Sequence, residues 1–114
     1  MKSVVWLGGC KEELSGMPDL IKDSFGFRLR RLQMGKTVAD MKPLFQLGHG
    51  VYELRESFDT NAYRLVYVVN LKTAIYVLDV FMKKSKTGIG LPKPDVERLR
   101  VRFKQALQMD EGKL

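Results

Sequence analysis

The sequence predicts an α+β domain, in which helices cover one face of a small antiparallel sheet of about four strands. Residues 51–84 contain three runs rich in Val, Ile, Leu, Tyr and Phe, separated by turn residues at 57–62 and 70–73. This pattern is typical of a three-stranded antiparallel meander. Two segments with apolar residues at helical spacing flank the meander. Because the chain has 114 residues, 45% of them hydrophobic, we expect one domain over residues 1–114.

The expected order of elements is strand, helix, helix, three strands and helix. Residues 3–7 predict the first strand and residues 11–15 a single helical turn. Pro18 suits the first turn of the next helix, which ends before Gly35. Its expected core residues are Ile21, Phe25, Leu29 and Leu32. The last helix begins at Pro94, and its expected core residues are Val96, Leu99, Phe103, Ala106 and Leu107.

A connector at residues 36–50 separates the first long helix from the meander. It is too apolar for a free linker, so we expect it to pack along the edge of the sheet. The side chains that predict this packing are Met41, Leu44, Phe45 and Leu47. His49 lies between two glycines in this connector. It is either a general-base candidate or an ordinary surface residue.

The charge balance favours an anionic partner. Twenty Lys and Arg against thirteen Asp and Glu give a net charge of +7, which points to nucleic acid first and an anionic membrane surface second. The sequence shows neither a membrane-spanning run nor the apolar core of a signal peptide, so we expect a cytoplasmic protein that does not enter a membrane. One cysteine, Cys10, and one histidine cannot form a disulfide or a zinc centre. We therefore expect neither a cofactor nor a metal.

Counting along the predicted strands brings charged residues together. If the turn between the last two strands is centred on residues 71 and 72, Arg64 lies opposite Asp79. A similar count across the first hairpin places Arg55 beside Arg64. Like charges directly across a hairpin are normally destabilising, so this pair of arginines invites an anionic ligand.

Side chains alternate between the two faces of a sheet, so one face carries Arg55, Arg64, Asp79 and Lys83. Two interpretations of this cluster remain open. The cluster binds an anion, or Glu53 and Asp79 simply neutralise the cations on a solvated face.

Further basic residues extend the candidate RNA-binding surface. Residues 83–94 are basic and rich in turn residues, and Lys84 and Lys86 lie in this stretch. It predicts either a loop that faces phosphates or a solvated loop. Arg30 and Arg31 belong either to the same RNA-binding surface or to a solvated helix face.

Residues 41–108 carry a family resemblance. The segments MKPLFQLGHGVYELR, YRLVYVV and AIYVLDVFMKKSKTGI, followed by a proline and an amphipathic helix, resemble the phage-derived HigB-type branch of the RelE/ParE toxin superfamily. The resemblance implies a RelE-like fold and the toxin of a type II toxin–antitoxin system. Such a toxin is an endoribonuclease that cuts mRNA on the ribosome, and its partner is a helix-turn-helix antitoxin of the HigA-like kind.

The resemblance carries over Arg55, Arg64 and the pair Lys83 and Lys84 as site residues. Members of this branch often have a histidine where this chain has Asp79. Metal-independent RNA cleavage needs proton transfer and cations that stabilise charge on phosphorus. Arginines can supply the charge, and a lysine beside them can transfer the proton. Asp79 then either orients Arg64 for catalysis or forms a structural ion pair with it.

Two other functions are compatible with the same resemblance. ParE-type relatives poison gyrase and need no nuclease site, so the arginines would then form a docking surface. A catalytically inactive, phage-derived RNA-binding or regulatory module is the third interpretation.

Overall fold

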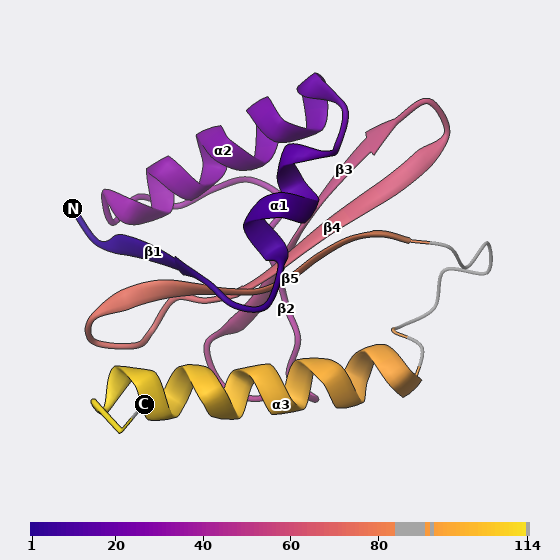
Figure 1. Cartoon of the computed structure of the whole chain (residues 1–114). Helices are drawn as coiled ribbons and strands as arrows, with labels where there is room; N and C mark the ends of the chain where they lie inside the picture. The colour runs from indigo at the N-terminus through magenta and orange to yellow at the C-terminus, as the bar shows by residue number, and fades with distance from the viewer. Residues whose placement is uncertain (84–90, 92, 114) are drawn as a thin grey trace.

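The computed structural model describes residues 1–83, 91 and 93–113 (Figure 1). Its elements are β1 (Ser3–Trp6), α1 (Cys10–Ser15), α2 (Asp19–Gln33), β2 (Lys42–Pro43), β3 (Val51–Phe58), β4 (Asn61–Val68), β5 (Ala74–Lys83) and α3 (Lys93–Asp110). The predicted α+β class is confirmed, and so is the predicted order of elements, to which the structure adds the two-residue strand β2.

The sheet has five strands in the order β1-β5-β4-β3-β2. Strands β3, β4 and β5 form the predicted antiparallel meander. The sheet is mixed, however, because β1 pairs with β5 in parallel. No hairpin joins these two strands, because two helices and strands β2 to β4 lie between them in the chain, and so nothing forces them to run antiparallel.

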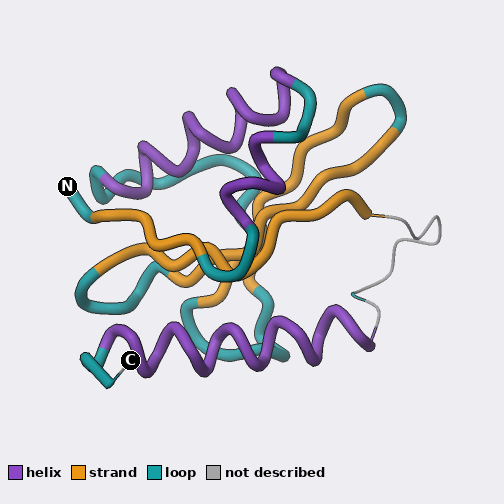
Figure 2. The backbone as a smooth tube through the Cα atoms, viewed as in Figure 1, coloured by secondary structure: helices purple, strands orange, loops and turns teal. Residues whose placement is uncertain are grey.

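Helices α1 and α2 lie together on one face of the sheet (Figures 1 and 2). The four core residues predicted for α2 are all buried there: Ile21, Phe25, Leu29 and Leu32. They pack with Leu54, Leu65, Tyr67 and Val77 from the strands. This cluster forms the first hydrophobic core.

Helix α3 covers the opposite face of the sheet (Figure 1). Its residues Leu99 and Ala106 pack against Val66, Val68 and Leu78. Both faces need a cover because Tyr63 to Val68 in β4 and Ala74 to Val80 in β5 are buried without interruption. Thus α1 and α2 share a face as expected, whereas α3 forms a third layer. Leu107, which was expected in the core, is exposed.

The two hairpin loops are stabilised differently. The β3–β4 turn consists of Asp59 and Thr60, both with positive φ (49° and 64°), as in the tight turns that match strand twist. The β4–β5 loop is held by Asp110 at the end of α3. Its carboxylate accepts hydrogen bonds from the Thr73 hydroxyl and from the backbone N–H groups of Lys72 (2.9 Å) and Thr73 (2.8 Å). These bonds lower the pKa of Asp110 to about 2.

The connector at residues 36–50 packs along the sheet edge as predicted. Its strand β2 pairs with β3, and Leu44 and Leu47 are buried. Phe45 is 81% exposed, so its predicted burial is wrong. His49 is an exposed surface residue. Within the described part of the chain, no helix is long and apolar enough to cross a membrane.

We predict that the packing of α3 stabilises the whole domain. Leu99→Ala should lower the free energy of unfolding by about 2 to 5 kcal/mol, because it removes buried methyl groups and leaves a cavity. Leu107→Ala is the matched control on the same helix, and its exposed side chain should contribute little. Urea unfolding of both variants measures the difference. Equal losses would contradict the position of α3.

Candidate functional site

Cations lie side by side on the sheet face that α3 covers, at the end of the strands nearest the β3–β4 turn. Arg55 pairs with Arg64 across β3 and β4, and Arg64 pairs with Phe81 across β4 and β5. Lys83 belongs to the next pair of that face, opposite Ala62. The predicted proximity of Arg55 and Arg64 is therefore confirmed.

Asp79 lies opposite Val66, not opposite Arg64 as the sequence count predicted. The count was two positions short for two reasons. The pairing of Val68 with Tyr76 centres the β4–β5 loop on Lys72, which adds one residue. An irregularity of the register between Val66 and Tyr67 adds the second. Val66 and Arg64 are two positions apart on β4 and therefore share a face of the sheet. Asp79, which pairs with Val66, thus still lies on the predicted face.

A buried carboxylate, that of Glu53, balances the two arginines. Its Oε1 accepts a hydrogen bond of 2.8 Å from Arg55 Nε. Its Oε2 lies 3.4 Å from Arg64 Nη1, within ion-pair distance. Glu53 and Arg64 are almost fully buried, whereas the side chain of Arg55 is 44% exposed. Glu53 does neutralise the cations, as one interpretation proposed, but the surface around Glu53 and Arg64 is not solvated.

Arg64 retains hydrogen-bonding capacity. Its Nε and Nη2 atoms are buried and have no hydrogen-bond partner within the described residues. Burial lowers the pKa of Arg64, and the charge of Glu53 opposes this effect. An arginine stays protonated in proteins even so. The unpaired N–H groups are donors that an anionic oxygen would satisfy.

Lys83 ends β5 beside these arginines. Partial burial and the positive charges of Arg64 and Arg55 lower its pKa, while Glu53 acts in the opposite direction. A larger share of this lysine is therefore neutral at a given pH than for an isolated lysine. A neutral amine can accept a proton, which arginine cannot do.

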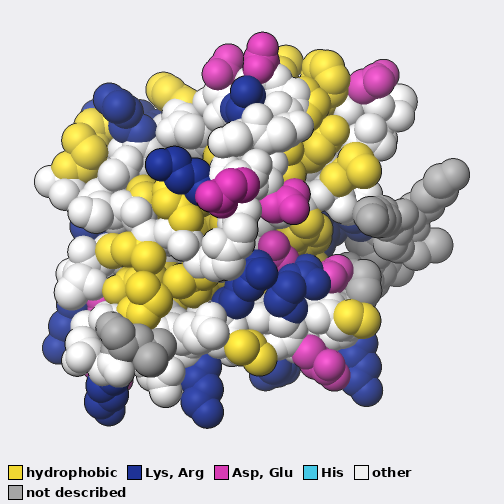
Figure 3. Space-filling model, viewed as in Figure 1, with side chains coloured by type: hydrophobic (Ala, Val, Ile, Leu, Met, Phe, Trp, Pro, Cys, Tyr) yellow, Lys and Arg dark blue, Asp and Glu magenta, His cyan; other side chains and the backbone are white. Residues whose placement is uncertain are grey.

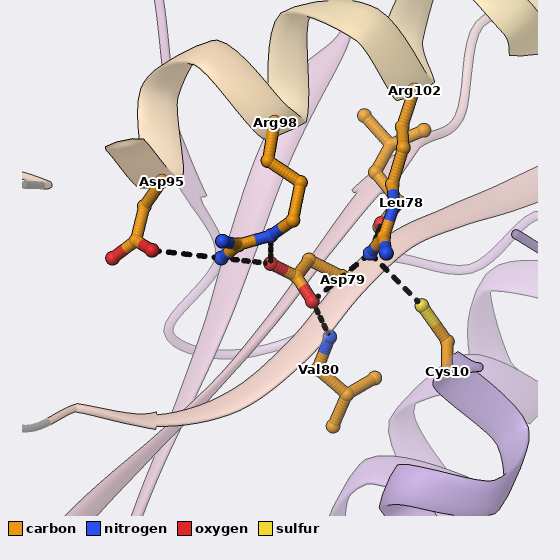
Figure 4. A network of polar contacts seen from close by, with 7 residues as sticks. All are labelled: Cys10, Leu78, Asp79, Val80, Asp95, Arg98 and Arg102. Carbon is orange, nitrogen blue, oxygen red and sulfur yellow. Dashed lines mark hydrogen bonds and ion pairs between the residues drawn. The ribbon is translucent and has the colours of Figure 1, made fainter. Parts of the chain in front are cut away.

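Asp79 is held by α3 and not by Arg64 (Figure 4). Its Oδ2 accepts hydrogen bonds from Arg98 Nη2 (2.7 Å) and Nε (2.9 Å), and its Oδ1 lies 3.2 Å from Arg102 Nη1. Arg98 also pairs with Asp95 at 2.8 Å. The expected ion pair between Asp79 and Arg64 is therefore wrong. The geometry gives Asp79 a structural task, since it ties α3 to β5.

Arg98 and Arg102 were missed as partners of Asp79, because the sequence shows them only as charged residues of an amphipathic helix. Their spacing of four residues places them on the same side of α3, which is the available signal. They line a hollow of about 710 Å³ between α1, β5 and α3. Figure 3 shows basic and acidic side chains gathered in this region. Cys10 lies deep in the same hollow, and its Sγ is 3.9 Å from Arg102 Nη1. Burial raises the pKa of the Cys10 thiol to about 11.

Comparison with protein families matches residues 12–104 to the family described as phage derived protein Gp49-like (DUF891). This match covers most of the chain. The chain belongs to the Gp49-like family. Comparison with curated proteins gives no match. The expected kinship with RelE-like, phage-derived proteins is thereby confirmed at the family level, and the HigB-type branch stays a prediction.

Two further predicted residues of this Gp49-like chain, Arg30 and Arg31, do not join the cluster. Arg30 and Arg31 lie on α2, which packs on the other face of the sheet. Lys84 and Lys86 lie outside the described residues. Over the ranges 1–83 and 93–113, no three His, Cys, Asp or Glu side chains are grouped to hold a metal ion. The candidate site of the Gp49-like chain is therefore the cluster of Arg55, Arg64 and Lys83 around Glu53.

Burial of Arg64 leads to a prediction about stability. Arg64→Ala should lower the free energy of unfolding by about 3 to 5 kcal/mol, because it removes one partner of a buried ion pair and leaves Glu53 with less compensation. Arg55→Ala should lower it by at most about 1 kcal/mol, because Arg55 is partly solvated. Adding Glu53→Gln to Arg64→Ala should recover part of the loss. Chemical denaturation of all variants measures these values, and equal effects of the two arginines would refute the assignment.

Proposed function

We propose that this Gp49-like protein is the toxin of a type II toxin–antitoxin system and a metal-independent endoribonuclease of the HigB type. The observation that carries the proposal is a lysine of lowered pKa beside two arginines on one sheet face. The net charge of +7 adds attraction for RNA. Ribosome-bound mRNA is the proposed substrate, and a HigA-like helix-turn-helix antitoxin is the proposed partner.

The chemistry uses the 2′-hydroxyl of RNA as the nucleophile. Neutral Lys83 accepts the proton of this hydroxyl, and the 2′-oxygen then attacks the adjacent phosphorus. The bond from phosphorus to the 5′-oxygen breaks, and that oxygen takes up a proton from solvent or from an ammonium group. The products are a 2′,3′-cyclic phosphate and a 5′-hydroxyl. No divalent ion is required, because the base and the positive charge both come from side chains.

The two arginines have different tasks in this mechanism. Arg55 is the more exposed and reaches the phosphate from solvent, where it stabilises the charge that develops on the non-bridging oxygens. Arg64 is fixed by burial and by Glu53, and its unpaired N–H groups add fixed positive potential beneath the same phosphate. Asp79 takes no proton in this scheme. With Arg98 and Arg102 it holds α3 against β5.

We predict that Arg55→Ala and Lys83→Ala each reduce RNA cleavage by about a hundredfold to a thousandfold, because each removes a group that acts mainly in the transition state. The melting temperature should change little, since both side chains are partly exposed. Arg100→Ala on the exposed side of α3 is the charge-matched control. The assays are cleavage on translating ribosomes, with the cut ends sequenced, and growth arrest upon induction. Stable variants as toxic as the parent would refute the nuclease site, and gyrase inhibition without RNA cleavage would indicate a ParE-like function.

A second prediction concerns pH and metal ions. Below the pKa of Lys83 the cleavage rate should rise about tenfold per pH unit, because the neutral fraction of the base rises in that proportion, and above it the rate should level off. Lys83→Arg keeps the charge but should abolish this dependence together with most activity. With a model RNA that the protein cleaves without ribosomes, excess EDTA should leave the rate unchanged. A rate lost to EDTA and restored by magnesium would contradict the mechanism.

A further inference from the structure

Helix α2 exposes a line of apolar side chains on the side that faces away from the sheet. Leu20, Phe27 and Met34 lie seven positions apart and are 50%, 65% and 45% exposed, and Met34 directly follows Gln33, the last residue of α2. Residues at this spacing fall on nearly the same line of a helix. No described residue covers the line, and α2 is the outermost element on its side of the sheet (Figure 2). A hollow of about 600 Å³, bordered by Arg31 and residues 37–39, adjoins the ring of Phe27. These observations indicate an interaction surface, because exposed apolar side chains that gather on one face and are rimmed by charged residues mark sites of protein interaction.

The charges beside this line are arranged with opposite signs at its two ends. Asp23 lies between Leu20 and Phe27, and Arg30 lies between Phe27 and Met34. Both are exposed and lie on the same side of the line. The surface is therefore negative in its first half and positive in its second half. Such a surface is complementary to a copy of itself turned end to end.

We propose that two copies of the chain associate through α2, antiparallel, around a two-fold axis at Phe27. This pairing sets Phe27 against its equivalent and Leu20 beside Met34 of the second copy. It also sets Asp23 beside Arg30 of the second copy, and the symmetry forms this ion pair twice. Parallel pairing would set Asp23 at the level of Asp23 and Arg30 at the level of Arg30 of the second copy, so it would form neither of these ion pairs. The heptad spacing suits helices that cross at about 20°.

The composition of the surface favours a protein over RNA as its occupant. Leu20 and Met34 offer aliphatic contact and no hydrogen bonds, and Asp23 would repel phosphates. The surface also lies on the face opposite Arg55 and Lys83, so an RNA bound at the candidate site does not reach it directly. A single helix face is smaller than the roughly 800 Å² per partner of a standard interface. The dimer should therefore be weak, with a dissociation constant in the micromolar range, and independent of the nuclease site.

Analytical ultracentrifugation of the full chain, from low micromolar to millimolar concentration, tests the dimer. The parent should show a monomer–dimer equilibrium. Phe27→Glu should raise the dissociation constant by about tenfold or more, since it sets two carboxylates against each other on the axis. Phe45→Glu is the matched control, because Phe45 is equally apolar and 81% exposed but lies in the connector. A parent that stays monomeric at every concentration would overturn the proposal, as would equal effects of the two substitutions.

A charge exchange tests the orientation. Asp23→Arg alone and Arg30→Asp alone should each weaken the dimer, because each sets like charges opposite one another. A mixture of the two variants should associate at least as tightly as the parent, since each copy then supplies one sign of charge. Failure of the mixture to associate would overturn the antiparallel arrangement. If Arg30→Asp leaves association unchanged and weakens RNA binding, the basic end of α2 belongs to nucleic acid and the proposal is wrong.

Discussion

The candidate site depends on one buried carboxylate. Arg55 and Arg64 face each other across a hairpin, where two positive charges repel, and Arg64 lies out of water. Glu53 lies two positions before Arg55 on the same face of β3. One of its carboxylate oxygens contacts each arginine, and this negative charge reduces the repulsion between them. One negative charge against two arginines and Lys83 leaves the cluster positive. The ion pair with Glu53 thus permits the burial of Arg64, and it leaves a net positive charge that an anion can neutralise.

Helix α3 sets the other boundary of the site. A continuous buried run in β5 needs cover on both faces, so α3 lies against the face that carries the cations. Asp79 fixes the helix there through Arg98 and Arg102, and the backbone carbonyl of Leu78 accepts a further bond of 2.9 Å from Arg102. The carboxylate therefore serves the position of α3. The Asp79 carboxylate makes no hydrogen bond to Arg64. The ion pairs that hold α3 are therefore separate from the cluster of Arg55, Arg64 and Lys83 at the end of the sheet.

The sequence was sufficient where local rules determine the geometry. A two-residue turn at Asp59 and Thr60 fixes the register of β3 and β4, and so the pairing of Arg55 with Arg64 could be counted correctly. Across β4 and β5 the same count failed, because a longer loop and a register irregularity leave no clear mark on the sequence. The third layer was missed although an apolar run such as Ala74 to Leu78 in β5 is typical of strands covered on both faces. Arg98 and Arg102 could not be found by strand counting, because they reach Asp79 from helix α3 and not from a neighbouring strand.

Two surfaces with different chemistry therefore lie on opposite sides of one sheet. The face under α3 combines buried charge with hydrogen-bond donors that lack partners, which suits a phosphate. The outer side of α2 combines apolar side chains with one acidic and one basic residue, which suits contact with another protein. Arg30 and Arg31 share the sign of the site residues, but the hydrophobic core between α2 and the sheet separates them from Arg64. The net charge predicted an anionic partner without placing the cations, whereas their positions in the three layers divide the basic residues between the two surfaces.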